Sequence, residues 1–267
     1  HMNADCFYTK WLPRKFKLRR LKEPLSKWQY ALGHKGWNSL FLENHDQPRS
    51  VNRFGSLEYR NESAKMLATY IFSQKGTPYI YQGQEIGMTN AHYTSIKQYK
   101  DVETLNMYKM LRRFFSEKKT MKMVQRASRD NSRTPMQWNR SKNAGFSKGK
   151  PWLEVNPNYI DINVEDSLKQ EVSILNYYKK FIALRKKYPV FVYGDYREHY
   201  PKSNKLAYYE RNYKGKKLLV ICNFTSKDLK FNPIYDLSKF KLILNNYQED
   251  HKHLLPYQAK IYLGEYQ

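Results

Sequence analysis

The chain has 267 residues, of which 40% are hydrophobic and 16% aromatic, a composition that excludes a disordered chain and is sufficient for one or two folded domains. It has no apolar run of about 18 residues, so we expect no membrane contact. Cys6 and Cys222 lie too far apart in sequence to indicate a metal motif or a disulfide framework, which favours a cytoplasmic protein. The formal net charge of +24 would fit a polyanion, but the basic residues are spread along the chain, so we expect no nucleic acid as a partner.

The first predicted element is a helix within the basic segment 10–27. Leu18, Leu21, Leu25 and Trp28 recur at helical spacing, so one face of this helix is expected to pack on a core while its basic face is solvated. Pro24 lies inside the pattern. Because proline removes a backbone donor, it is expected to kink the helix or to confine it to the residues that follow.

Segment 37–55 contains the strongest functional signal. Trp37, Leu40, Phe41 and Leu42 predict a strand at 38–42 that is covered on both faces, as in a parallel sheet under helices. A dense polar cluster follows directly, consisting of Glu43, Asn44, His45, Asp46, Gln47 and Arg49. Parallel α/β folds bind ligands at the carboxyl ends of their strands. We therefore expect a site at this strand end.

The predicted order of strand, helix and strand continues through residue 85. Residues 62–74 carry an apolar stripe typical of a helix, and Gly76 is expected to adopt a positive φ at its C-cap. A second strand is predicted at 77–81, followed again by polar residues. A further helix is predicted at 101–119.

The next predicted element is a long irregular segment at about 122–165. Its aromatic residues Trp138, Phe146 and Trp152 favour an ordered loop over the site. Ser167 and Gln170 fit a capping box that begins a helix ending near residue 187.

The hydrophobic period changes from 3.6 to 2 at Pro189. Strands are predicted at 197–200, 205–213, 217–224, 241–245 and 259–263, with turns at 203–204 and 214–216. This pattern indicates a small antiparallel β domain.

Three blocks of the sequence together resemble glycoside hydrolase family 13, the α-amylase family. They are NHDQPR (44–49), GTPYIYQGQEIGM (76–88), and SRDNSRTPMQW (128–138) with its continuation to Tyr159. The third block resembles the oligo-1,6-glucosidase and α-glucosidase branch in particular. The likeness runs from residue 1 to about 189 and continues weakly to the end.

The resemblance implies roles for individual residues. Asp46 corresponds to the family carboxylate that stabilises the glycosyl transition state, and His45 to a histidine that donates a hydrogen bond to the same sugar. Arg133 corresponds to an arginine that contacts the sugar. The alternative for Arg133 is an ion pair with Asp130. Arg49 and Glu43 are expected to line the same cleft or to form a salt link behind it. The ligand implied is an α-linked gluco-oligosaccharide, with no cofactor and no metal.

The family's nucleophile and acid/base blocks, which retaining hydrolysis requires, are not found in this sequence. Only 36 residues precede Trp37, too few for six earlier units of a (β/α)8 TIM barrel of about 250 residues. The expected fold is α/β then β: residues 1–189 as the last two strands and helices of the barrel, and 190–267 as an antiparallel β-sandwich-like domain. The expected partner is the missing N-terminal half, without which the chain is expected to be inactive. The alternatives are a non-catalytic carbohydrate-binding paralogue and, less favoured, a basic nucleic-acid binder.

Overall fold

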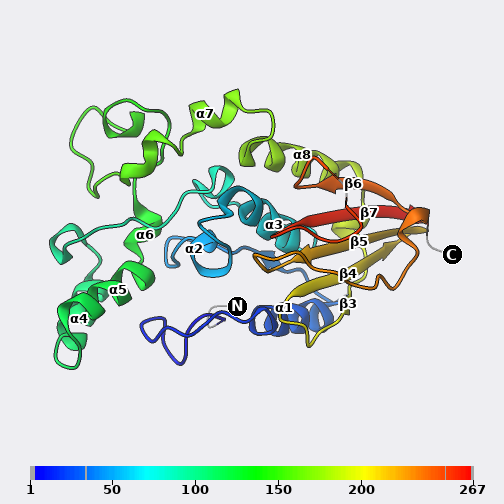
Figure 1. The fold of residues 1–267 in the computed structure, drawn as a ribbon, viewed down its shortest axis with the longest axis horizontal. Helices are drawn as coiled ribbons and strands as arrows, with labels where there is room; N and C mark the ends of the chain where they lie inside the picture. Colours follow the sequence, from blue (N-terminus) through cyan, green and yellow to red (C-terminus); the bar gives the residue numbers. More distant parts are fainter. Residues whose placement is uncertain (1–3, 34, 250, 266–267) are drawn as a thin grey trace.

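The computed structural model describes residues 4–33, 35–249 and 251–265 (Figure 1). The helices are α1 (Leu18–Leu32), α2 (Ser50–Phe54), α3 (Arg60–Phe72), α4 (Val102–Leu111), α5 (Glu117–Ala127), α6 (Asp130–Arg133), α7 (Val164–Lys169), α8 (Ile174–Lys187) and α9 (Val190–Tyr193). The strands are β1 (Ser39–Leu40), β2 (Thr77–Pro78), β3 (Arg197–His199), β4 (Leu206–Tyr213), β5 (Lys216–Asn223), β6 (Lys241–Asn245) and β7 (Ala259–Glu265). None of these helices has the length and apolar character that crossing a membrane requires, as far as the described residues go.

Strands β1 and β2 pair in parallel, with Ser39 opposite Thr77, and helix α3 connects them. The predicted βαβ order is therefore present. The prediction that the first strand is covered on both faces is wrong, because Trp37 is 48% exposed and Phe41 is only partly buried. In the described part of the chain this sheet has two strands.

Helix α1 begins at Leu18 and includes Pro24, so the helix is not confined to the residues after the proline. Leu18, Leu21 and Leu25 are buried as predicted, whereas Trp28 is 56% exposed. Three leucines on one side of the helix bury enough apolar surface to hold it in place across the proline, which leaves one backbone hydrogen bond unmade.

The single helix predicted at 101–119 is wrong, because the chain forms two helices, α4 and α5, with a turn at 112–116 between them. The Ser116 hydroxyl accepts a hydrogen bond from the backbone N–H of Lys119, which caps α5 and starts a new helix. Helix α5 also extends to Ala127, within the segment predicted to be irregular.

The predicted capping box at Ser167 and Gln170 is also wrong. Ser167 lies inside α7, and Ser173 is the N-cap of α8, where its hydroxyl accepts from the N–H of Asn176 at 3.2 Å. The predicted end of this helix at residue 187 is confirmed. Both serines precede apolar residues, so the sequence pattern does not separate them.

The five C-terminal strands form one antiparallel sheet in the order β3-β4-β5-β7-β6. The predicted strands agree with the observed ones to within two residues at each end. The expectation of a sandwich is corrected, because the second layer is not a sheet. Residues 229–240, which are mostly irregular, pack Leu229, Phe231 and Tyr235 against Leu219 and Ile221 of β5.

The opposite face of this sheet packs on α3, so both parts of the chain share one core. Leu67 of α3 and Phe181 of α8 lie in the same apolar cluster as Val220 and Ile261 of the sheet. Helix α3 is buried on nearly all sides, because it packs against α8 and against β5 and β7 of the large sheet (Figure 1). The division into residues 1–189 and 190–267 stays a prediction, and its residues 1–3 and 266–267 lie outside the described range.

Gly76 adopts a φ of 142°, but it does not cap α3, whose C-cap is Ser73. A Cβ at Gly76 would lie 2.4 Å from the carbonyl oxygen of Asn38, which accepts the first β1–β2 hydrogen bond from Thr77 at 2.8 Å. Glycine is therefore required by close approach of the two strands as well as by its φ.

We expect Gly76→Ala to lower the free energy of unfolding by roughly 2–4 kcal/mol, because the new methyl group adds overlap to a strained φ. Gly215→Ala is the matched control, since Gly215 also has a positive φ of 74° but nothing lies within 4 Å of its Cβ position. Urea unfolding followed by circular dichroism measures both. Equal losses for the two variants would contradict the close-approach argument.

Candidate functional site

The site begins with a tight turn at the carboxyl end of β1. The side-chain oxygen of Asn44 accepts a hydrogen bond from the N–H of Asp46 at 2.9 Å, and Gln47 N–H donates to the Asn44 carbonyl at 3.2 Å. Asparagine favours such a turn because its side chain can replace a backbone acceptor. The turn projects His45 and Asp46 outward, with 69% and 44% of their side chains exposed.

Two arginines hold one oxygen of Asp46. Arg129 Nη1 and Arg133 Nη2 donate to Asp46 Oδ1 at 3.2 and 3.1 Å. Asp46 Oδ2 lies 3.2 Å from His45 Nε2. Arg133 also donates from Nε to the His45 carbonyl at 2.9 Å, so the same side chain fixes the turn and its carboxylate. The structure thus brings together the predicted residues His45, Asp46 and Arg133.

A buried carboxylate, Asp101, lies behind the arginines and is 1% exposed. Arg129 donates to Asp101 Oδ1 from Nε at 3.1 Å and from Nη2 at 2.5 Å, and Thr104 donates to Oδ2 from its hydroxyl and backbone. Burial by itself raises the pKa of Asp101, but the hydrogen bonds from Arg129 and Thr104 outweigh it and lower this pKa. The hydrogen bond to Asp101 raises the pKa of Arg129 in turn. Asp101 therefore anchors Arg129 beneath Asp46.

Glu43 and Arg49 form a buried salt link next to the turn that carries Asp46. Both side chains are almost fully buried, and Arg49 Nη1 lies 3.2 Å from Glu43 Oε2. Glu43 Oε1 accepts from the backbone and hydroxyl of Ser50, and Arg49 donates to the Gln82 carbonyl at 2.7 Å. This pair ties the end of β1 to the segment after β2. The salt link expected behind the cleft is therefore present, and Glu43 also lines the open pocket at the ends of β1 and β2.

The sequence did not point to Arg129 or Asp101. The available signal was the spacing of Arg129 and Arg133, since residues four apart on a helical turn project to the same side. The alternative partner proposed for Arg133, Asp130, points elsewhere: its Oδ2 accepts from the backbone N–H groups of Lys100 and Asp101 at 2.7 and 2.9 Å. Asp130 thus holds the start of α4, where Asp101 is the N-cap.

This arrangement can bind hydroxyl groups and stabilise a nearby positive charge. Asp46 offers a carboxylate to solvent, and His45 offers a ring nitrogen. Two further carboxylates contact Arg129: Asp101 is too deeply buried to attack a substrate, and Glu103 Oε2 lies 3.3 Å from Arg129 Nε. No group of three histidine, cysteine or acidic side chains in the described residues could hold a metal ion.

An open pocket of about 340 Å³ lies beside this turn, at the ends of β1 and β2. Its lining residues are Ser39, Phe41, Glu43, Asn44, Tyr79, Ile80 and Tyr81. Tyr79 and Ile80 are 56% and 37% exposed. The site therefore borders an uncovered apolar surface.

Comparisons with known proteins give a consistent assignment. The α-amylase catalytic domain profile matches residues 2–194. The oligo-1,6-glucosidase of Halalkalibacterium halodurans is 48% identical over 96% of this chain and 47% of its own length. The oligo-1,6-glucosidase of Bacillus cereus is 48% identical over 98% of this chain and 49% of its own length. The crystal structure of trehalose-6-phosphate hydrolase from Bacillus licheniformis superposes with a TM-score of 0.92 at 42% identity, over 98% of this chain and 50% of that one.

The chain spans about half the length of these curated relatives. The matched region includes β1, β2 and the residues around Asp46. Because the catalytic-domain profile matches well over half of its residues, the chain belongs to the α-amylase family, glycoside hydrolase family 13.

Proposed function

We propose that the chain is the C-terminal part of an α-glucosidase-type glycoside hydrolase, which cleaves α-glucosidic bonds in short oligosaccharides with retention of configuration. The observation that carries this proposal is the exposed carboxylate of Asp46, fixed by Arg129 and Arg133 at the carboxyl end of β1. We place the protein in the cytoplasm, in keeping with the absence of a disulfide at Cys6 or Cys222.

In this proposal Asp46 stabilises the positive charge that develops on the sugar ring in the transition state, and His45 donates a hydrogen bond to a sugar hydroxyl. Arg133 orients both groups, since it contacts the His45 carbonyl and the Asp46 carboxylate. Glu43 and Arg49 hold the strand end from behind. The nucleophile and the acid/base would come from an N-terminal half that completes the barrel.

Isomaltose-type oligosaccharides are the substrates we favour, because two of the relatives described above are oligo-1,6-glucosidases. Trehalose 6-phosphate is a second candidate, because the structural neighbour hydrolyses it. A carbohydrate-binding paralogue without catalysis is the alternative to an enzyme.

The test is turnover of isomaltose, trehalose 6-phosphate and p-nitrophenyl α-glucoside by the chain alone and by the chain co-expressed with the N-terminal half of the H. halodurans relative. We expect no turnover by the chain alone and measurable turnover by the complex, because the nucleophile and acid/base blocks that a retaining mechanism requires are not found in this sequence. If the chain alone turned over a substrate and Asp46→Asn abolished that turnover, the assignment of the nucleophile and the acid/base to an N-terminal half would be wrong. Sugar binding without turnover in a stable complex would favour the paralogue.

A further inference from the structure

A second cavity lies away from Asp46, where α8 meets the edge of the large sheet. It encloses about 590 Å³ between the start of α8, Lys65 of α3 and residues 242–248 of β6 and the segment after it. This volume falls within the range of about 300–1,000 Å³ typical of small-molecule sites. None of its lining residues belongs to the site around Asp46.

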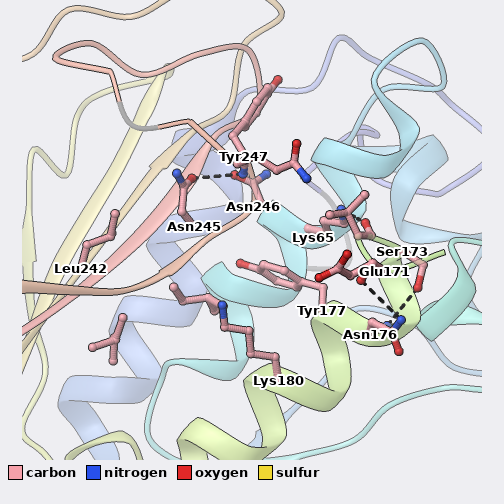
Figure 2. A pocket seen from close by; sticks show the side chains of 14 residues that line it. Lys65, Glu171, Ser173, Asn176, Tyr177, Lys180, Leu242, Asn245, Asn246 and Tyr247 are labelled. Atoms are coloured by element: carbon pink, nitrogen blue, oxygen red, sulfur yellow. Dashed lines mark hydrogen bonds between the residues drawn. The ribbon is translucent and has the colours of Figure 1, made fainter.

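The walls of this groove carry hydrogen-bonding groups of several kinds. Asn176 and Lys180 project from α8 and Glu171 precedes it, while Tyr247 and Gln248 lie on the opposite wall. Figure 2 shows the α8 side chains facing those of the segment after β6 across the cavity. Glu171, Lys180 and Gln248 offer donors and acceptors, and the Tyr247 ring offers an apolar face.

The groove walls are held in place by bonds to the rest of the fold. Asn176 Nδ2 donates to the Gln170 carbonyl at 2.8 Å. On the other wall, Asn246 Nδ2 donates to the Glu62 and Tyr257 carbonyls at 3.0 and 2.8 Å, and the Tyr247 hydroxyl donates to the Pro256 carbonyl at 2.6 Å. The groove is therefore formed before any ligand enters, which lowers the entropy cost of binding.

The two exposed charges of the groove are opposite in sign, which favours a neutral ligand. Lys65 is buried and its ammonium donates to the Val172 carbonyl at 2.5 Å, so this donor is already engaged. Glu171 and Lys180 are exposed, and neither is in an ion pair within the described part of the chain. Their charges are opposite, so an anion or a cation would meet attraction from one and repulsion from the other.

We propose that this groove is a second binding site for a neutral polyhydroxylated ligand, a short gluco-oligosaccharide, separate from the Asp46 site. Lys180 and Glu171 would bond hydroxyl groups from one wall, and Gln248 from the other. The choice of a glucose-based ligand rests on the proposed function, whereas the preference for a neutral polyol rests on the groove itself.

The test is binding of isomaltotriose to the full chain by isothermal titration calorimetry. We expect saturable binding in the millimolar range that Lys180→Ala weakens about fivefold and the double variant Glu171→Ala/Lys180→Ala at least about tenfold, since each loses a hydrogen bond from a charged group. Lys179→Ala is the matched control, because Lys179 is the exposed neighbour on the same helix but does not line the groove. Thermal unfolding by circular dichroism checks that all variants fold.

An Asp46→Asn arm separates this proposal from the proposed function. Binding that Lys180→Ala weakens and Asp46→Asn leaves unchanged supports the groove. Binding that only Asp46→Asn weakens would assign the sugar to the Asp46 site and overturn the groove, while leaving the proposed function in place. Three other results would overturn the groove as a site for a neutral polyol. They are the absence of saturable binding, a loss of affinity with Lys179→Ala equal to that with Lys180→Ala, and displacement of the sugar by inorganic phosphate.

Discussion

Asp46→Asn in the complex with an N-terminal half is expected to lower kcat by about 10²–10³-fold while changing KM much less. The amide has the shape of the carboxylate but no charge, so the ground-state contacts are largely kept. What is lost is the attraction to positive charge that appears only as the glycosidic bond breaks. Steady-state hydrolysis of isomaltose measures both constants.

Asp161→Asn is the matched control for this variant, because Asp161 is an exposed aspartate whose side chain lies outside the site. Its kcat is expected to equal that of the unmodified complex. His45→Ala is expected to have a milder effect than Asp46→Asn, since it removes one hydrogen-bond donor and no charge. Equal kcat values for the Asp46→Asn and unmodified complexes would show that the charge of Asp46 has no part in the reaction.

The antiparallel sheet was predictable because short runs rich in apolar and aromatic residues, bounded by turn residues, are a local signal. Strands β4 and β5 were predicted to within one residue at each end, with the turn at 214–216 between them. Helix boundaries were less predictable, because several serines compete as caps. Ser116 and Ser173 cap helices, whereas Ser167 does not, and only tertiary packing separates these choices.

The exposed part of the candidate site was predictable from the sequence and its buried support was not. His45 and Asp46 follow a strand end, where polar residues are placed for ligands. Asp101 and Arg129 meet across 28 positions of sequence through the packing of α4 against the segment before α6, which no local pattern encodes. Glu43 and Arg49 looked equally suited to the cleft, and their burial as a pair appears only in the fold.

The uncovered side of β1 and β2 provides the second large expected effect. Phe41, Tyr79 and Ile80 line an open pocket at the ends of two strands that, in the described part of the chain, pair only with each other. Unpaired strand edges and apolar faces of this kind bind other strands. If an N-terminal half completes the barrel, as proposed, it would cover this surface with parallel strands and their apolar side chains.

We therefore expect Ile80→Asp to weaken binding of the H. halodurans N-terminal half at least about tenfold, because a carboxylate would be buried without a partner in place of an apolar side chain. Ile234→Asp is the matched control, since Ile234 is 49% exposed against 37% for Ile80 but lies in the irregular segment beside the large sheet. Titration of one purified half with the other gives the dissociation constant without relying on activity. Equal weakening by the two substitutions would show that the face of β1 and β2 is not where the two halves meet, and the barrel would then have to close through a different surface.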